Sequence, residues 1–417
     1  MTHLVLFIAL TWAAGCRAVH AELAVPALFP AALAQQWLMQ DPSVLAAQSE
    51  LAAAQVEAQQ TAASPYEWTS RLSYQQRDYS TGSVSHEWNV GLERQIRLPA
   101  KRRADQALAG ATIAAAQAQL ELARRQAADD LVGGWLGWLT AHAITASLTQ
   151  QQRFAEDNVG AVAKRIKSGD AAQIDYRLAI GEVSAIERSV SAARTEEAIA
   201  YAKLSARFAI EGMQPLPLPE PLSPPHDVGW WQARTLAVSA QLAAAKAAQA
   251  KAEAGVARAA AGRMPDPTLG VYAASEAHGD ENIVGGTLSI PFPGTRRTLE
   301  VQRRVAQVNA ARDRRAALEL ELNGSARAAY ANAMGTYASW QLSRNGADVQ
   351  RENAVIAQKA YTLGEQDLQT LLLARRQALS AAEADQQARA AALRAYVALL
   401  LEAKLLWQPA LPEVAEP

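Results

Sequence analysis

Cysteine is almost absent from this sequence, and side chains that ligate metals or carry out catalysis are sparse. The 417 residues include one cysteine, Cys16, and six histidines that lie far apart. No cysteine or histidine pair has the spacing of metal ligands, and no glycine-rich phosphate loop follows a predicted strand. The sequence therefore predicts no cofactor, no metal site and no enzymatic activity.

Aromatic residues, excess charge and long apolar runs are also scarce. Aromatic residues make up 6% of the chain and the formal net charge is -1, so nothing in the composition indicates a nucleic-acid partner. Half of the residues are hydrophobic, with alanine in excess, which is typical of long and closely packed helices. No run of 18 apolar residues follows the N-terminal segment, so any membrane-spanning segment must be a strand.

The N-terminal apolar stretch predicts export. Leu4–Gly15 has the length and polarity of a signal-peptide core, although no lysine or arginine precedes it. Cleavage after Val19–Ala21 removes a signal peptide of residues 1–21, and Cys16 with it. The alternative site, Ala13–Cys16, resembles a lipobox and leaves Cys16 to carry lipid. Both alternatives lead to export.

Two similar units organise the rest of the chain. In each, two runs of alternating polar and apolar residues flank a turn, which predicts a β-hairpin, at about 66–96 and about 267–291. The exits from the hairpins, Leu98–Arg103 and Phe292–Arg297, lie 194 residues apart. A second marker, a glycine turn at 168–172 and at 363–367, repeats at nearly the same spacing. Together these markers indicate an internal duplication.

The duplication defines the predicted domains. Repeat 1 covers residues 22–212 and repeat 2 covers residues 229–408. A proline-rich, extended linker at 213–228 joins them, and residues 409–417 form a tail. In each repeat a helix of about 70 residues follows the hairpin, which corresponds to roughly 100 Å.

The helix lengths predict how each repeat packs. A helix of about 32 residues before the hairpin and one of about 40 after the glycine turn together match the long helix. We expect the two shorter helices to return along the long one, end to end, as an antiparallel coiled coil. Four strands are too few to enclose a pore and leave unpaired edges, so several chains must share one barrel.

This pattern resembles the TolC-like outer membrane factor family over nearly all of the mature chain. The resemblance is carried by Pro265–Gly270, by the exit Ile290–Pro293, and by Tyr361–Glu365 followed by Leu371–Arg376. Within the family, the first two stretches are most similar to outer-membrane components of heavy-metal efflux of the cobalt–zinc–cadmium type. The resemblance implies a mainly α fold with β: a homotrimer with a twelve-stranded β-barrel in the outer membrane and a twelve-helix periplasmic tunnel.

The resemblance also implies a function, the exit duct of a tripartite efflux system. Its partners are a periplasmic membrane-fusion adaptor and a proton-driven inner-membrane pump of the RND type. The implied substrates are heavy-metal cations, and the alternative is drugs or other organic solutes. Two further hypotheses compete: a periplasmic coiled-coil adaptor or structural protein, which leaves the hairpins unexplained, and an envelope enzyme, which lacks a catalytic set.

The glycine turns are the predicted tip of the tunnel, where the resemblance places adaptor docking. The candidate docking residues are Gly169, Gly364, Tyr361 and Glu365. The alternative for each glycine is a helix cap in the left-handed conformation, which is compatible with docking.

Carboxylates near the tip are candidates for a narrow acidic aperture. The candidates are Asp170, Asp175 and Asp367. Three copies around a threefold axis would bring like charges together and could bind cations. The alternative is that these carboxylates complement the helix dipole at helix starts.

Four arginines follow the predicted strands. Arg102, Arg103, Arg296 and Arg297 lie at the expected boundary between membrane and periplasm. They face anionic lipid headgroups of the outer membrane, or they form an ordinary polar helix face.

Overall fold

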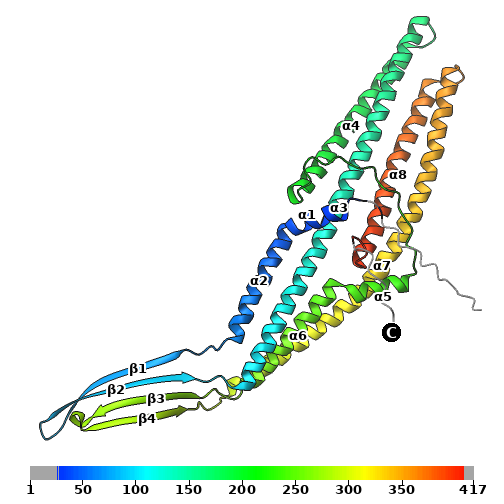
Figure 1. The fold of residues 1–417 in the computed structure, drawn as a ribbon. Helices are drawn as coiled ribbons and strands as arrows, with labels where there is room; N and C mark the ends of the chain where they lie inside the picture. The colour runs from blue at the N-terminus through cyan, green and yellow to red at the C-terminus, as the bar shows by residue number, and fades with distance from the viewer. Residues whose placement is uncertain (1–25, 27, 408–417) are drawn as a thin grey trace, which may run out of the picture.

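The structure is a computed structural model that describes residue 26 and residues 28–407. Long helices form an extended body, and a four-stranded sheet projects from one end (Figure 1). The predicted signal peptide, both candidate cleavage sites with Cys16, and the predicted tail lie outside the described residues. The predicted fold class, mainly helical with a small β part, is confirmed.

Repeat 1 consists of four helices and one hairpin. These are α1 (Ala31–Gln40), α2 (Pro42–Ala62), β1 (Trp68–Asp78), β2 (Val84–Gln95), α3 (Pro99–Ser168) and α4 (Gln173–Arg207). Asp41 separates the first two helices, since its carboxylate accepts hydrogen bonds from the backbone N–H groups of Ser43 (2.9 Å) and Val44 (3.3 Å). Pro42 then occupies the first position of α2, where its missing N–H costs nothing.

Repeat 2 has the same order of elements. These are α5 (Val228–Val238), α6 (Ala240–Ala261), β3 (Thr268–Glu276), the short 3-10 turn η1 (Ala277–Gly279), β4 (Glu281–Ser289), α7 (Thr295–Thr362) and α8 (Leu368–Glu402). The prediction of a single helix before this hairpin is wrong, because the helix is interrupted at Ser239. The Ser239 hydroxyl accepts a hydrogen bond from the backbone N–H of Leu242 (3.2 Å) and so starts α6.

The shorter helices pack along the long helices, as the helix lengths predicted. Helices α2 and α4 pack along α3, and α6 and α8 pack along α7, in each case on successive parts of the long helix (Figure 1). Helix α3 also packs against α6 and α8, which joins the two repeats side by side. None of the described helices is long and apolar enough to cross a membrane.

The two hairpins form one antiparallel sheet in the order β1-β2-β3-β4. The strands contain 11, 12, 9 and 9 residues. The β2–β3 pair, from Gln95 opposite Thr268 to Trp88 opposite Ser275, unites the repeats. Within the described chain β1 and β4 have no further partner, so both edges of the sheet are open.

The core lies midway along the helical body. Trp135 of α3 and Trp231 of α5 are fully buried there, together with Phe208 after α4. The proline-rich linker crosses the same level, and Arg389 of α8 donates a hydrogen bond to the carbonyl of Pro219 (3.0 Å). The core therefore ties the linker and the ends of the shorter helices to the long ones.

Candidate functional site

The register of the sheet gives it one apolar face. Side chains alternate across each strand, so residues paired in register share a face. A few polar residues, such as Ser70, His86 and Arg94, lie on this face among large hydrophobic residues. The large hydrophobic residues are exposed in the chain and include Trp68, Leu72, Tyr74, Trp88, Val90, Leu92, Leu269, Val271, Val284 and Leu288. An exposed apolar area of this kind marks a surface that needs an apolar environment.

The opposite face of the sheet is polar. It carries two cross-strand ion pairs, Arg71 with Glu93 and Arg77 with Glu87, both at 3.0 Å. Tyr272 lies flat over Gly285 on the neighbouring strand, where an added Cβ would come within 2.6 Å of the ring. One face of the sheet therefore suits water and the other suits an apolar solvent.

A buried polar joint lies where the strands meet the helices, and its centre is Asp266. This carboxylate is only 2% exposed. It accepts hydrogen bonds from the Tyr66 hydroxyl (2.6 Å) and the Leu98 backbone N–H (3.0 Å). It also forms ion pairs with Lys101 (3.0 Å) and Arg97 (3.2 Å).

A second buried carboxylate extends the joint. Asp105 of α3 forms ion pairs with Arg97 (2.7 Å) and with Arg258 of α6 (2.8 Å). Arg97 thus bridges both carboxylates, and the joint fastens the exit from β2 to the entry into β3. Because Asp266, Lys101 and Asp105 are all buried, each charge depends on its partners to offset the loss of water.

The contacts of Asp266 change its pKa. Burial alone raises the pKa of this carboxyl, but hydrogen bonds from Tyr66 and Leu98, together with the charge of Lys101, outweigh burial and lower the pKa to about 2. Asp266 is therefore ionised at any physiological pH. In the sequence, Asp266 was noticed only as part of Pro265–Gly270, and the joint was not predicted. The signal in the sequence was the four-residue spacing of Arg97, Lys101 and Asp105, which continues from the exit of β2 into the first turns of α3.

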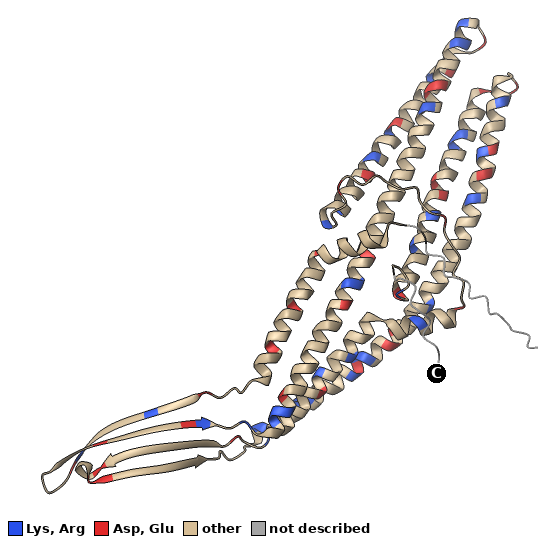
Figure 2. Ribbon diagram, in the orientation of Figure 1, with Lys and Arg blue, Asp and Glu red and all other residues tan. Residues whose placement is uncertain are grey.

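The four predicted boundary arginines lie beside this joint, and they differ in environment. Arg102, Arg103 and Arg296 are exposed. Arg297 is half-buried and donates a hydrogen bond to the carbonyl of Gly262 at the end of α6. Figure 2 shows lysine and arginine gathered where the strands meet the helices.

The two predicted tip glycines lie at the end of the body far from the sheet (Figure 1). Gly169 has φ +84° and Gly364 has φ +76°, which are left-handed values that favour glycine. The N–H of the next residue bonds back in both turns, from Asp170 to Arg165 (2.8 Å) and from Glu365 to Ala360 (2.9 Å). Both glycines therefore cap their helices, and they reverse the chain at the same end.

The three predicted aperture carboxylates lie in the same turns, and each makes a local hydrogen bond. Asp170 accepts from the Ser168 hydroxyl (2.8 Å), and Asp175 accepts from the backbone N–H of Ala172 (3.2 Å). Asp367 accepts from the backbone N–H of Thr370 (2.8 Å), which lowers its pKa. Within one chain they belong to two separate turns, so a single copy does not bring them together.

Contacts between the two coiled coils near the tip went unnoticed in the sequence. Arg165 of α3 donates to the carbonyl of Tyr361 (3.2 Å), and its guanidinium lies 4.7 Å from the centre of that ring. Arg376 of α8 forms an ion pair with Glu182 of α4 (2.5 Å). A small apolar cluster adjoins these contacts and includes Tyr361, Val162 and Leu371. We call the two arginine contacts the tip latch, since they hold α3 and α4 against α7 and α8.

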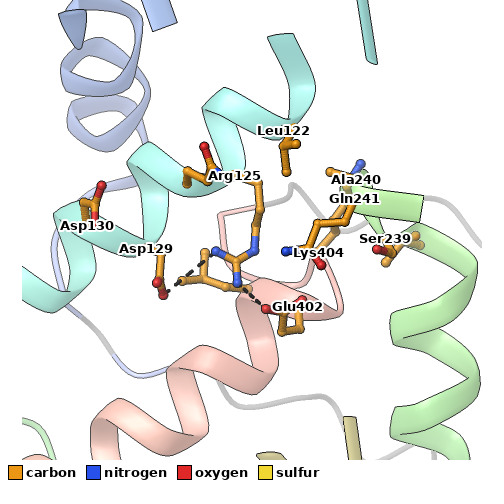
Figure 3. A pocket seen from close by; sticks show the side chains of 12 residues that line it. Leu122, Arg125, Asp129, Asp130, Ser239, Ala240, Gln241, Glu402 and Lys404 are labelled. Carbon is orange, nitrogen blue, oxygen red and sulfur yellow. Dashed lines mark hydrogen bonds and ion pairs between the residues drawn. The ribbon is translucent and has the colours of Figure 1, made fainter. Parts of the chain in front are cut away.

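A pocket of about 430 Å³ lies between α3, the start of α6 and the end of α8 (Figure 3). Arg125 crosses it to reach Glu402 (2.5 Å) and Asp129 (3.9 Å), and Lys404 borders the same space. Charges of both signs therefore pair within the pocket. Across the described residues, no group of three or more histidine, cysteine or acidic side chains is placed to hold a metal ion.

Comparison with known proteins finds similarity in structure alone. No family model matches the sequence, and no curated protein matches it. The outer membrane protein VceC from Vibrio cholerae is 18% identical, with a TM-score of 0.72 over 89% of this chain and 95% of that chain. The CmeC outer membrane channel of Campylobacter jejuni is 14% identical, with a TM-score of 0.70 over 89% and 84%.

A third solved structure agrees with these two. The outer-membrane channel OprN is 20% identical, with a TM-score of 0.69 over 91% of this chain and 90% of that chain. Coverage is high in both directions, so the likeness extends over most of this chain and most of each known structure. The chain therefore has the TolC-like fold of outer-membrane channels.

Proposed function

We propose that the protein is the outer-membrane exit duct of a tripartite efflux system. The observation that carries the proposal is the two-faced sheet at one end of a helical body of about 100 Å. The apolar face contacts lipid and the polar face lines an aqueous passage. The helices extend into the periplasm, and the tip receives a membrane-fusion adaptor and an inner-membrane RND-type pump. Conduction is passive.

The duct is a homotrimer in this proposal. The open edges of β1 and β4 pair between copies, so that three chains supply a twelve-stranded barrel and twelve helices around the tunnel. A second observation supports assembly: exposed apolar residues recur at every seventh position along the last turns of α7 and at its C-cap. They are Leu342, Val349 and Ile356 in α7 and Leu363 at the cap. A stripe of this period is the pattern that a neighbouring helix covers in a coiled coil.

Charges placed on this stripe are expected to abolish the trimer. The Leu342→Glu/Ile356→Glu variant would bury two unpaired carboxylates in each contact between copies, which costs several kcal/mol per contact. The mass of the detergent-extracted protein should fall from trimer to monomer in light scattering. Arg351→Glu, on the opposite and exposed face of α7, should leave the trimer intact. A double variant that stays trimeric would show that the stripe lies outside the contact.

The tip is the proposed gate and the proposed adaptor site. Gly169 and Gly364 reverse the helices there, and the exposed Glu365 accompanies Tyr361 at the second turn. In a trimer, three copies of Asp170, Asp175 and Asp367 surround the axis and form an acidic aperture. Rotation of one coiled coil against the other separates the tip latch and widens the aperture.

The proposed substrates are heavy-metal cations, and their support is the resemblance of Pro265–Gly270 and Ile290–Pro293 to metal-efflux components. The alternative is organic solutes through the same duct. Deletion of the gene separates these alternatives, with growth measured in zinc, cadmium and cobalt and in dyes, detergents and antibiotics. Sensitivity to metals alone is the expected result. Sensitivity to organic compounds alone would retain the duct and overturn the metal substrate, and sensitivity to neither would overturn the duct.

The same assay tests the role of the tip. Gly364→Pro is expected to fail to restore growth, because proline fixes φ near -65° and the turn needs +76°. Gly346→Ala is the control, since Gly346 lies inside α7 without a positive φ and has open space where a Cβ would project. Restoration of growth by Gly364→Pro would contradict the proposed gate.

A further inference from the structure

The helix end of the sheet carries arginines that have no partner. Arg102 and Arg103 lie at the start of α3, Arg263 follows α6, and Arg296 lies at the start of α7. All four side chains are exposed, and within the described residues none of their guanidinium groups makes a hydrogen bond or an ion pair. Arg263 was not among the boundary residues predicted from sequence. We call these four residues the arginine belt.

Several neighbouring basic residues form ion pairs with carboxylates, whereas the belt residues do not. Lys101 and Arg258 are paired in the buried joint with Asp266 and Asp105. Farther along α7, Arg303 pairs with Glu300. Arg297 bonds only to the carbonyl of Gly262, so the charge left unbalanced at this level comes from the arginine belt together with Arg297.

The opposite end of the sheet has the opposite charge. Its acidic residues are Asp78, Glu87, Glu276, Asp280 and Glu281. Among the basic residues of the two hairpins, Arg77 lies at that end and pairs with Glu87 and Glu276. Figure 2 shows this polarity, with acidic residues at the loops and basic residues at the helices. The sheet is thus electrostatically asymmetric along its strands.

The arginine belt lies directly beside the edge of the apolar face. Strand β2 ends at Gln95 and Arg102 follows seven residues later, within the first turn of α3. In the exit from β4, the Phe292 side chain is 98% exposed and lies four residues before Arg296. An exposed aromatic ring beside an unpaired arginine matches the two layers of a lipid surface, acyl chains below phosphate headgroups.

We propose that the arginine belt binds the anionic headgroups of phospholipids in the leaflet that faces the helices. The inference rests on the proposed insertion of the sheet into a membrane. The belt residues project from three elements along the boundary, so they suit a surface of many headgroups rather than one enclosed ion. Their contacts fix the depth of the sheet in the bilayer and concentrate anionic lipid around it.

The test compares two fourfold variants of the full chain. Arg102→Gln, Arg103→Gln, Arg263→Gln and Arg296→Gln together remove the belt. The matched control replaces four exposed arginines of α3 and α4, which lie far from the sheet and whose guanidinium groups make no hydrogen bond or ion pair within the described part of the chain: Arg153→Gln, Arg177→Gln, Arg188→Gln and Arg194→Gln. Partition of the detergent-extracted protein is measured into vesicles of phosphatidylethanolamine alone and into vesicles that also contain phosphatidylglycerol.

Wild type and control are expected to prefer the anionic vesicles, and the belt variant should lose at least about tenfold of this preference. High salt should reduce the wild-type preference to that of the variant, because the contact is electrostatic. Two results would overturn the proposed lipid binding by the belt and leave the membrane proposal intact. One is an equal preference for anionic vesicles in all three proteins, and the other is full competition by inorganic phosphate at low concentration. Failure of the wild type to insert into either vesicle would overturn the membrane proposal as well.

Discussion

An Arg165→Ala/Arg376→Ala variant is expected to remain folded and to conduct far more current than the wild type. Arg165 contributes a hydrogen bond to the Tyr361 carbonyl and a contact with its ring, and Arg376 contributes an ion pair with Glu182. A hydrogen bond to a charged group stabilises the closed state by about 1.5–3 kcal/mol. The Arg376–Glu182 ion pair contributes less, because the Arg376 side chain is exposed to water. Loss of both contacts should therefore raise the open population at least about tenfold.

Single-channel recording in planar bilayers measures this change directly. The open probability of the variant should rise, and cells that carry it should become sensitive to large antibiotics that the closed duct excludes. Arg351→Ala is the control, because it removes an exposed ion pair with Asp348 that lies within α7 and joins no two helices. An unchanged open probability in the latch variant would place the gate elsewhere.

The second large effect is expected at the buried joint. Asp266→Ala leaves the buried Lys101 without a carboxylate, whereas Arg97 keeps its pair with Asp105. Removing one partner of a buried ion pair costs about 3–5 kcal/mol. The variant should unfold at a markedly lower urea concentration, or fail to accumulate in the membrane. Glu300→Gln is the matched control, since its carboxylate pairs with Arg303 and Arg304 at the surface, where water screens the charges and the loss of stability should be small.

A second variant separates a charge effect from a loss of packing. Asp266→Leu combined with Lys101→Met removes both charges and keeps the volume filled, and such replacements are often neutral. It should recover a large part of the stability that Asp266→Ala loses. If the double variant is as unstable as Asp266→Ala, the joint acts through shape or through the hydrogen bonds of Tyr66 and Leu98.

The joint also predicts that the stability of the folded protein falls at acidic pH. The folded pKa of Asp266 is about 2, below its ordinary value of 3.8, so its contribution is fully present above pH 3.8. That contribution, about 2 kcal/mol, is lost as the pH falls from 3.8 through 2. Over this window, unfolding of the wild type should become easier relative to Asp266→Asn, whose amide does not titrate.

Local patterns in the sequence were sufficient for most of the fold. Alternation of polar and apolar residues located both hairpins, and Gly169 and Gly364 located the turns, because these signals depend on neighbours in the chain. Ser239 was missed as a helix break because it lacks the proline that follows Asp41. Its role as a cap appears only when the packing of α5 and α6 is known.

The polar contacts between distant parts of the chain were harder to predict from the sequence than the fold. Tyr66 and Asp266 are 200 residues apart, and no local pattern pairs them. Arg165 and Arg376 look in sequence like solvated charges on a helix, whereas in the structure they reach Tyr361 and Glu182 on other helices. Such pairs depend on the angle and register between helices, which alanine-rich sequences leave open over many positions.

The buried joint occurs once in each chain although the sequence is duplicated. At the exit of the second hairpin, 194 residues later, Pro291, Thr295 and Leu299 occupy the places of Arg97, Lys101 and Asp105. The contact between the two hairpins of one chain is therefore fixed by charge. In the proposed trimer, the contact between β1 of one copy and β4 of the next would have to form without such a joint, so each copy would bring a pre-formed four-stranded segment to the assembly.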